Sequence, residues 1–439
     1  SDIIDRIFVF QKKVEKYWPD INEDKEYDGI RVQYLSSTLF ANYEFRVFNI
    51  YRNDEQRKVE QLHFTSWPDH GVPLYSQTLK PFLQKLLKIP NSSKSPLIVH
   101  CRMAAREGFV DFLAVLEHIR SQRTNMVDNI EQYKLAHLAV LECLFGMETS
   151  IACNDDIDKE VTGLIRADGI RKQMRYLENT EWQDRAMDTI WEVGKAGVPD
   201  YPEKNRFQEI VPEPQHLMYL SYYPHHDVTS SYINAVKVDG FCNPNRYIVT
   251  QQPMPNTLGD FWRLVYERKC GVIISLNKID CKDKLLNIDV KQTCCRFWPI
   301  DEEILSPVDF LSIRILEVRE IGLLPIIRLY MNSKIDEIPN CKLNPHELSV
   351  TARRVCRYTL TLACILVIIS DGATASGLYI AMSFIIEKMK LEHECDVCLA
   401  VRTIRHKRKE FVRNREQFEF LYRASVTYIN GFQSYSNFA

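Results

Sequence analysis

The sequence predicts an α/β protein that consists of two related modules in tandem. Three observations support this prediction. Apolar runs typical of buried strands alternate with helical patterns, and strands and helices that share one core are typical of an α/β domain. The chain resembles itself over a long interval, and its 439 residues leave room for two or three domains of ordinary size. Hydrophobic residues make up 45% and charged residues 26%, as in globular proteins.

The internal repeat has two markers. Residues 119–133 resemble residues 404–418 at an offset of 285, and residues 17–19 resemble residues 297–299 at an offset of 280. A solenoid would repeat at a far shorter period. We therefore expect a duplicated domain.

The two copies are unequal in length. The first module, residues 1–150, begins partway through its own domain and is expected to be truncated. Residues 151–180 are rich in charge and are expected to form a linker that runs into the opening helices of the second module. That second module occupies residues 181–439.

The first copy is also shorter inside. Gly377 lies 27 residues before Ile404, whereas its apparent counterpart Gly108 lies only 11 residues before Ile119. Sixteen residues are therefore absent from the first copy, which is about the length of a helix.

Individual elements follow from the apolar patterns. Residues 96–100 and 364–369 are continuous apolar runs, typical of buried strands. Residues 377–389 and 415–429 have the spacing of amphipathic or buried helices. The basic run at residues 402–409 lies on a predicted helix, and we expect it to form a solvated face rather than a nucleic-acid site.

Composition excludes several functions. The net charge of -2 produces no overall field that would recruit nucleic acid or an anionic membrane, so neither is an expected partner. The thirteen cysteines follow no disulfide framework and favour reduced thiols in the cytosol. The longest apolar stretch, residues 360–369, is about half a membrane span, and the first residues show no signal-peptide pattern. Any membrane anchor is expected to lie outside this chain.

No metal or other cofactor is expected. Cys395 and Cys398 form the one Cys-x-x-Cys pair in the sequence, and zinc usually needs a second pair of ligands at similar spacing. No such pair follows, so these two cysteines are predicted to be structural.

Two segments of the first module contain the residue types that covalent phosphate chemistry requires. Hydrolysis of an aryl phosphate through a covalent intermediate needs an anionic nucleophile, an acid for the leaving group and fixed donors for three phosphate oxygens. A cysteine that ends a strand, before a loop that opens a helix, combines nucleophile and donors. Residues 99–108 place a cysteine after an apolar run, and residues 63–73 read His-Phe-Thr-Ser-Trp-Pro-Asp-His-Gly-Val-Pro.

These segments resemble those of the protein tyrosine phosphatases. Residues 63–73 are similar to the mobile acid loop of that family almost letter for letter, and residues 100–101 resemble the start of its signature, His-Cys-x5-Arg-Ser/Thr-Gly. Residues 204–207, 232–235 and 247–262 resemble its scaffold motifs, and tandem modules resemble its receptor-type branch. The resemblance implies that each module is a twisted mixed sheet flanked by helices.

The resemblance also implies three catalytic roles in the first module. Asp69 takes the position of the general acid, Cys101 that of the nucleophile, and Arg106 that of the residue which grips phosphate. The alternatives are a loop carboxylate, a buried thiol and a solvated arginine at a helix start.

The first module departs from the family pattern at its signature. Four residues, rather than five, separate Cys101 from Arg106, and Glu107 stands at the strict arginine position. No glycine lies between Cys101 and Arg106, whereas the family uses glycines for tight turns there. The water-positioning glutamine of the family aligns with Asp128. We expect this module to be impaired.

The second module is predicted to be catalytically dead. The nucleophile position falls on Ile369, the arginine position on Ala375 and the acid position on Ile335. The glutamine position is Arg413 and the substrate-stacking tyrosine is Phe207. Isoleucine has no nucleophilic atom and alanine cannot bind phosphate, so the resemblance implies a pseudophosphatase.

Two functions remain open. One is a binding or regulatory role in phosphotyrosine signalling, without turnover, in the cytoplasmic part of a membrane receptor, with phosphotyrosine proteins or a regulatory protein as partner. The other is an active tyrosine phosphatase that uses Cys101, Asp69 and Arg106 through a cysteinyl-phosphate intermediate. A fragmentary or mis-spliced coding sequence would also explain the late start and the sixteen absent residues.

Overall fold

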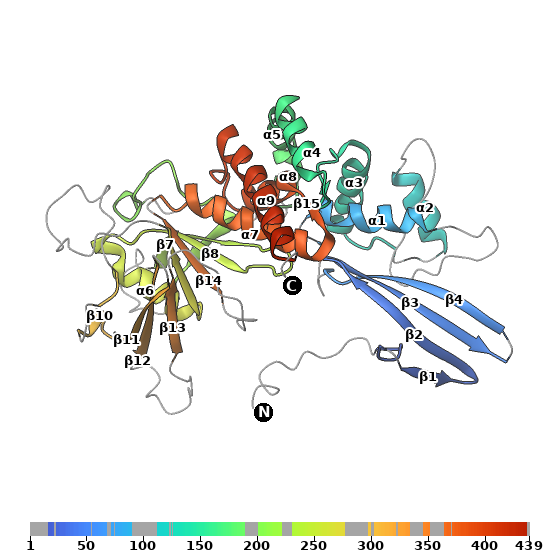
Figure 1. The fold of residues 1–439 in the computed structure, drawn as a ribbon, viewed down its shortest axis with the longest axis horizontal. Helices are drawn as coiled ribbons and strands as arrows, with labels where there is room; N and C mark the ends of the chain where they lie inside the picture. Colours follow the sequence, from blue (N-terminus) through green and yellow to red (C-terminus); the bar gives the residue numbers. More distant parts are fainter. Residues whose placement is uncertain are drawn as a thin grey trace. The chain divides into compact units, whose positions relative to one another are not determined.

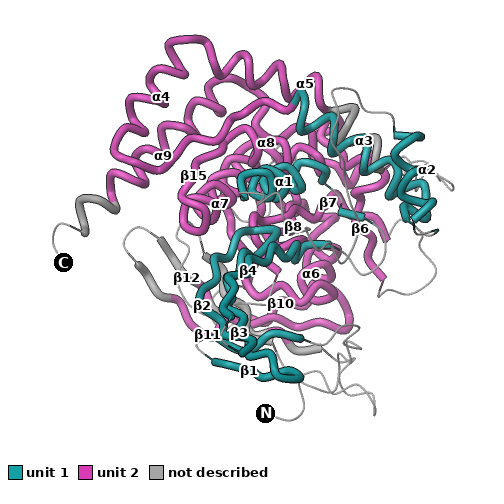
Figure 2. The backbone as a smooth tube through the Cα atoms, turned by 90° about the vertical axis from the view of Figure 1, so that its right-hand side faces the viewer, with its two compact units in different colours: residues 1–145 teal, residues 146–439 magenta. Residues whose placement is uncertain are grey.

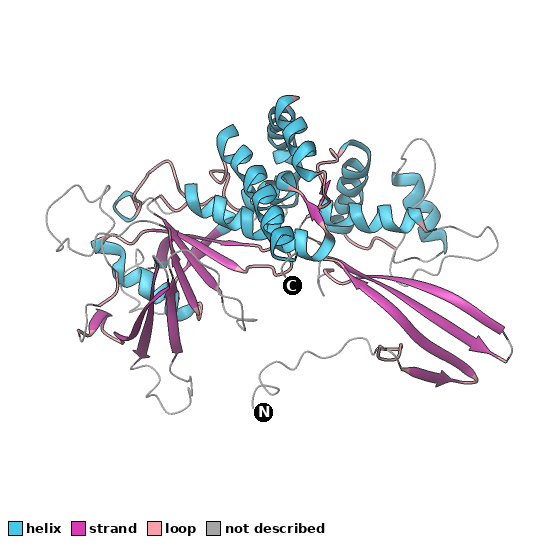
Figure 3. Ribbon diagram, viewed as in Figure 1, coloured by secondary structure: helices cyan, strands magenta, loops and turns pink. Residues whose placement is uncertain are grey.

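The protein is represented by a computed structural model. It describes residues 16–21, 23–53, 55–67, 72, 73, 75–89, 112–122, 124, 126–188, 201–221, 231–276, 297–299, 303–321, 324–333, 346–351, 364–369 and 371–436. The chain divides into two compact units, Ser1–Phe145 (unit 1) and Gly146–Ala439 (unit 2), which Figure 2 distinguishes by colour. Each unit combines strands with helices (Figure 3), so the predicted α/β class is confirmed.

Unit 1 contains, within its described residues, an antiparallel sheet of four strands in the order β1-β2-β3-β4 (Figure 1). The strands are β1 (Asp24–Tyr27), β2 (Ile30–Leu39), β3 (Tyr43–Arg52) and β4 (Glu55–Phe64). Asp28 and Gly29 join the first pair with φ of 44° and 78°, the left-handed backbone that a two-residue hairpin needs.

The helices of unit 1 follow its sheet in the sequence. They are η2 (Ser76–Thr78), α1 (Leu79–Lys88), α2 (Phe112–Gln122) and α3 (Ile130–Phe145). The ring of Phe82 in α1 meets Tyr43 and Phe64 edge to face, with centroids 5.6 and 5.4 Å apart. Because aromatic rings bury large areas in this geometry, these contacts fix α1 on the ends of β3 and β4.

Unit 2 contains, in its described part, a sheet of nine strands in the order β10-β11-β12-β13-β9-β14-β8-β7-β6. The strands are β6 (Leu217–Tyr219), β7 (Tyr232–Val238), β8 (Tyr247–Gln251), β9 (Val272–Ser275), β10 (Leu305–Val308), β11 (Leu311–Ile321), β12 (Leu324–Ser333), β13 (His346–Thr351) and β14 (Ile365–Ile369). The neighbours β13, β9, β14 and β8 run parallel, and the pairs on either side of them are antiparallel. The implied mixed sheet is confirmed.

Helices cover both faces of this sheet (Figure 1). They are α4 (Ile157–Arg166), α5 (Gly169–Asp188), α6 (Leu258–Glu267), α7 (Thr374–Glu392), α8 (Val397–Arg405) and α9 (Arg415–Ser436), with the short turns η4 (Pro202–Lys204), η5 (Pro214–His216) and η7 (Pro255–Thr257). A small antiparallel pair, β5 (Ile151–Ala152) with β15 (Glu394–Cys395), joins the start of unit 2 to the α7–α8 connection.

The two faces of strand β14 pack into two different hydrophobic clusters. Val367 packs in one hydrophobic cluster with α4, α5, α7, α8 and α9. Leu366 and Ile368 pack in a second cluster with α6. Successive side chains of a strand point to opposite faces, and this central strand is apolar throughout because both faces are covered. The predicted buried strand at residues 364–369 is thereby confirmed.

Element positions confirm the repeat. Helices α2 and α8 begin 285 residues apart, as do α3 and α9, whereas β4 and β12 begin 269 residues apart. The interval from β4 to α2 is therefore sixteen residues shorter than the interval from β12 to α8. In unit 2, α7 lies within this interval.

Other sequence-based expectations have mixed outcomes. The helices predicted at residues 377–389 and 415–429 are parts of α7 and α9. The strand predicted at residues 96–100 lies outside the described residues. None of the helices in the described part of the chain has the length and apolar character of a membrane span.

The boundary between the modules differs from the expectation. The structure divides the chain after Phe145, and the expected linker, residues 151–180, instead forms β5, α4 and most of α5 inside unit 2. The physical reason is burial: Ile157 and Ile170 are 1% and 0% exposed in the core that also contains α7 and α9.

Candidate functional site

The candidate site of unit 2 is the signature loop, defined here as residues 369–377, of which all but residue 370 are described. It connects β14 to α7, at the carboxyl end of a central parallel strand. Ligands of α/β sheets commonly bind at such ends. The backbone oxygen of Ile369 accepts hydrogen bonds from the amides of Gln252 (2.7 Å) and Gly372 (3.1 Å), which fixes the start of the loop on β8.

Gly372 gives the loop its turn. Its φ is +69°, in the left-handed region that side chains rarely adopt, and an added Cβ would lie 2.9 Å from the backbone nitrogen of Gln251. Only glycine fits here without a shift of the backbone. The loop therefore makes a tight turn at this glycine.

The positions of unit 2 that the sequence resemblance assigns to catalysis carry Ile369, Ala375 and Arg413. Ile369, at the nucleophile position, is 8% exposed, and Ala375, at the arginine position, lies in the first turn of α7. Arg413, at the glutamine position, is exposed and its Nε donates to the backbone oxygen of Glu410 (3.2 Å). The assignment of these three residues to catalytic positions rests on the sequence resemblance.

Asp371 occupies the start of α7. Its Oδ1 accepts hydrogen bonds from the amides of Ala373 (2.9 Å) and Thr374 (3.0 Å), and its Oδ2 accepts one from the Thr374 hydroxyl. These donors are at the positive end of the helix. No role for Asp371 was predicted from the sequence, although an acidic residue just before a helix is a recognisable capping signal.

Arg408 supports the loop from inside the fold. Its guanidinium is 2% exposed and donates to the backbone oxygen of Gly372 (3.2 Å) and to Oδ1 of Asn234 (2.7 Å). Burial lowers the pKa of Arg408 to about 10, and the nearby carboxylates of Glu410 and Asp371 act in the opposite direction.

The basic run was predicted wrongly in part. Residues 402–409 were expected to form a solvated face, but Arg402 is 5% exposed and Arg408 is 2% exposed. Arg402 donates to the hydroxyl of Tyr176 (3.1 Å). Both guanidiniums satisfy polar groups inside unit 2, which composition alone cannot reveal.

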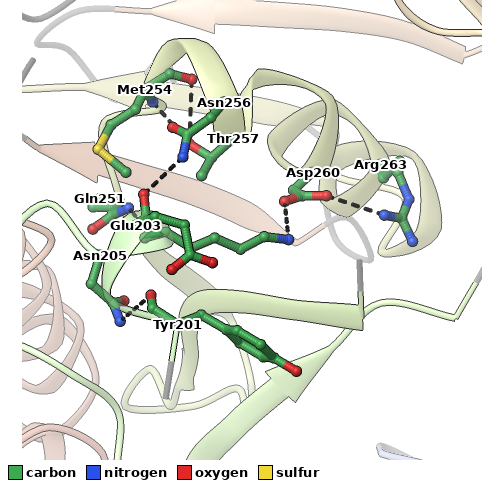
Figure 4. Close-up of polar contacts among 10 residues, drawn as sticks. Tyr201, Glu203, Asn205, Gln251, Met254, Asn256, Thr257, Asp260 and Arg263 are labelled. Atoms are coloured by element: carbon green, nitrogen blue, oxygen red, sulfur yellow. Dashed lines mark hydrogen bonds and ion pairs between the residues drawn. The ribbon is translucent and has the colours of Figure 1, made fainter. Parts of the chain in front are cut away.

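Residues 204–207, which resemble a scaffold motif of the family, make internal contacts in unit 2. Figure 4 shows Asn205 donating to the backbone oxygen of Tyr201 (3.2 Å) and Asp260 paired with Arg263 (3.1 Å). Lys204 also pairs with Asp260 (2.9 Å). Burial raises the pKa of Asp260, although both cations act to lower it. The aromatic ring that follows, Phe207, packs partly buried against the core.

The predicted site residues of unit 1 lie outside the described residues: Asp69, Cys101 and Arg106, as does Ile335 of unit 2. Two residues that the sequence resemblance assigns to motif positions of the family are described. Trp67, within the acid-loop segment, is 46% exposed. Asp128 precedes α3, and its amide donates to Oε1 of Gln132 (3.3 Å).

The predicted structural role of the Cys-x-x-Cys pair agrees with its surroundings. Cys395 and Cys398 are 0% and 1% exposed, and burial raises the pKa of Cys395 to about 12. Among the residues that the structure describes, no cluster of histidine, cysteine and acidic side chains could hold a metal ion.

Comparisons with known proteins give a consistent picture. The family model described as "Protein-tyrosine phosphatase" matches residues 7–105, 102–142, 201–322 and 342–427. Receptor-type tyrosine-protein phosphatase U of Gallus gallus is 27% identical over 96% of this chain and 31% of its own length. Tyrosine-protein phosphatase Lar of Drosophila melanogaster is 25% identical over 97% of this chain and 22% of its own length.

A human relative matches a larger share of its own length. Receptor-type tyrosine-protein phosphatase epsilon of Homo sapiens is 27% identical over 98% of this chain and 66% of its own length. By contrast, the chain spans less than a third of the length of the chicken and fly relatives. Matched segments fall in both units and cover more than half of the chain. The chain belongs to the protein-tyrosine phosphatase family, as a receptor-type member with two modules in tandem.

Proposed function

We propose that the chain acts in phosphotyrosine signalling by binding or regulation, without turnover, as the cytoplasmic part of a membrane receptor. The observation that carries the proposal is Ile369, a buried aliphatic side chain at the end of β14 where this family places its nucleophile. A covalent phosphoenzyme needs a thiolate at this point, and isoleucine has no atom that can attack phosphorus.

Two neighbours of Ile369 add to the argument. Ala375 leaves the loop without the guanidinium that would bind two phosphate oxygens. Asp371 brings a carboxylate to the amides at the start of α7, so the loop carries negative charge where a phosphate would need positive groups. Each change alone would weaken phosphate chemistry, and the three together remove it from unit 2.

A short interval in unit 1 also supports the proposed lack of turnover. The interval between β4 and α2 is sixteen residues shorter than the corresponding interval of unit 2. Cys101 and Arg106 lie within this short interval, one residue closer together than the family signature requires.

The binding partner we propose is a phosphotyrosine protein or a regulatory protein that contacts unit 2.

Hydrolysis of a small aryl phosphate tests the proposal. The purified chain is compared with its Cys101→Ser variant, with circular dichroism as a check that both are folded. We expect the same background rate from both proteins. Turnover by the native chain that disappears in the variant would overturn the proposed lack of activity in unit 1.

The alternative function is an active tyrosine phosphatase in unit 1. The near-complete acid loop at residues 63–73 favours it, because the sequence resemblance assigns Asp69 the role of the acid that protonates a phenolate leaving group. In that case Cys101 would form a cysteinyl phosphate, which water would then hydrolyse. The same assay with an Asp69→Asn variant would show a loss of rate for aryl phosphates with poor leaving groups.

A further inference from the structure

We propose that Asp371 is a built-in substitute for a bound oxyanion: it holds the signature loop of unit 2 in a liganded arrangement and excludes phosphate from it. The inference rests on the proposed function, because it explains how the signature loop of unit 2 excludes phosphate. It concerns an intramolecular contact and assigns no turnover to unit 2.

The first step is the geometry of the donors. One carboxylate receives the amides of Ala373 and Thr374 at 2.9 and 3.0 Å together with the Thr374 hydroxyl. Convergent amides at the start of a long helix form a typical anion-binding arrangement. Here the anion belongs to the chain itself, so an external oxyanion would have to compete with a covalently tethered carboxylate.

A buried positive charge contacts the signature loop from inside the fold. Arg408 is fully buried, donates to the backbone oxygen of Gly372, and has an Nε without a hydrogen-bond partner among the residues that the structure describes. Ser376, also fully buried at the first turn of α7, has an Oγ that likewise lacks a partner in the described part of the chain. A buried cation requires nearby negative charge. The carboxylate of Glu410 contributes most of it, and that of Asp371 adds to it from the loop.

The Asp371 carboxylate and a phosphate would compete for the same backbone amides. The amides of Ala373 and Thr374 cannot bind a carboxylate and a phosphate at the same time, and the carboxylate would repel a phosphate that approached the same amides. The turn at Gly372 is a property of its backbone, the contact with Arg408 uses the Gly372 carbonyl, and Glu410 still balances the charge of Arg408 when the Asp371 carboxylate is removed. A small neutral residue at position 371 should therefore leave a preformed but vacant anion site.

Hydrogen exchange of the full chain with and without sodium tungstate tests this inference. Exchange is followed by mass spectrometry in peptides that cover the start of α7, which separates unit 2 from any binding at Cys101. In the native chain, tungstate is expected to leave these peptides unchanged. In Asp371→Ser, exchange should be faster than native without tungstate, and about tenfold slower when tungstate is about tenfold above its Kd.

A second variant and a matched control keep the result interpretable. Asp371→Asn removes the charge but keeps an oxygen for the amides, so it folds even where the serine variant is unstable, and it should gain weaker protection by tungstate. Asn414→Ala is the matched control, because it removes the Oδ1 atom that accepts the Gln417 amide at the start of α9 (2.9 Å). Tungstate should leave hydrogen exchange in this variant unchanged. The inference is overturned by equal protection of the native chain, or by an absence of protection in the folded variants at position 371. Neither outcome depends on the aryl phosphate assay.

Discussion

Thr149 and Asp396 lie 247 residues apart in the sequence, and the hydroxyl of Thr149 donates a 2.7 Å hydrogen bond to the buried carboxylate of Asp396. The same oxygen, Oδ1, accepts the amide of Leu399 at 2.9 Å and so caps α8. Ser150 binds Glu394 (2.7 Å) next to the β5–β15 pair. The first residues of unit 2 are thereby fixed to the connection between α7 and α8.

Replacement of Thr149 by valine should destabilise unit 2. The substitution keeps the side-chain shape but removes the donor, so a buried carboxylate oxygen loses one of its two partners. The expected loss in the free energy of unfolding is about 1–3 kcal/mol. Urea unfolding followed by tryptophan fluorescence measures it.

Ser150→Ala is the matched control for this loss. Its acceptor, Glu394, has a side chain that is 47% exposed and can bind water instead. The control should cost less than about 1 kcal/mol. Equal losses in both variants would contradict the importance of the buried contact.

The stability of unit 2 should depend on pH through Asp396. Burial raises the pKa of this carboxyl, although the Leu399 amide, Lys388 and Thr149 act to lower it. Between the ordinary pKa of about 4 and the raised value, the folded state retains a proton that the unfolded state has lost. The free energy of unfolding should therefore fall as the pH rises through this window, by at most about 1.4 kcal/mol per pH unit for this group.

Asp396→Asn should remove this part of the pH dependence. Both hydrogen bonds end on Oδ1, so an amide in place of Oδ2 mimics the protonated acid and leaves them intact. Urea unfolding from pH 4 to pH 8 should give similar stability for both proteins at the acidic end and higher stability for the variant at the basic end. A parallel pair of curves would show that Asp396 keeps an ordinary pKa.

The turn at Gly372 should tolerate no side chain. Gly372→Ala places a Cβ 2.9 Å from the backbone nitrogen of Gln251 in a left-handed conformation, which should cost about 2–4 kcal/mol. Gly163→Ala in α4 meets no atom within 4 Å and should stabilise the protein by about 0.5–1 kcal/mol. Thermal unfolding of the two variants beside the native chain gives the comparison, and a neutral Gly372→Ala would show that the loop can adopt another turn.

Strong periodic signals predicted much of the fold from the sequence. The apolar run that forms β14 and the helical spacing of α7 and α9 were sufficient, because packing on both faces of a sheet leaves few alternatives. The repeat also located corresponding elements of the two units. Residues 151–180, which contain α4 and most of α5, were assigned to a linker because their many charges mask a narrow apolar stripe. Ile157 and Val161 show its four-residue spacing, typical of a helix face.

The site was harder to predict than the fold. Alignment placed Ile369 and Ala375 at the catalytic positions, which required only residue identity. The roles of Asp371 and Arg408 depend on which donors face them after folding, and residue type alone favours solvent for both. A buried arginine that binds the Gly372 carbonyl becomes visible only once β14, α7 and the segment after α8 are brought together.

Restoring the lost catalytic residues of unit 2 should fail unless Asp371 is also removed. Ile369→Cys with Ala375→Arg supplies a nucleophile and a guanidinium, but the amides of Ala373 and Thr374 still bind the Asp371 carboxylate. Addition of Asp371→Ser frees those donors, and fixed donors for a developing oxyanion are each worth about a hundredfold in rate. Measured in a Cys101→Ser background with an activated aryl phosphate, the triple variant should turn over at least about a hundredfold faster than the double variant. Equal rates would mean that Asp371 does not compete with phosphate, since the nucleophile and the arginine are the same in both proteins.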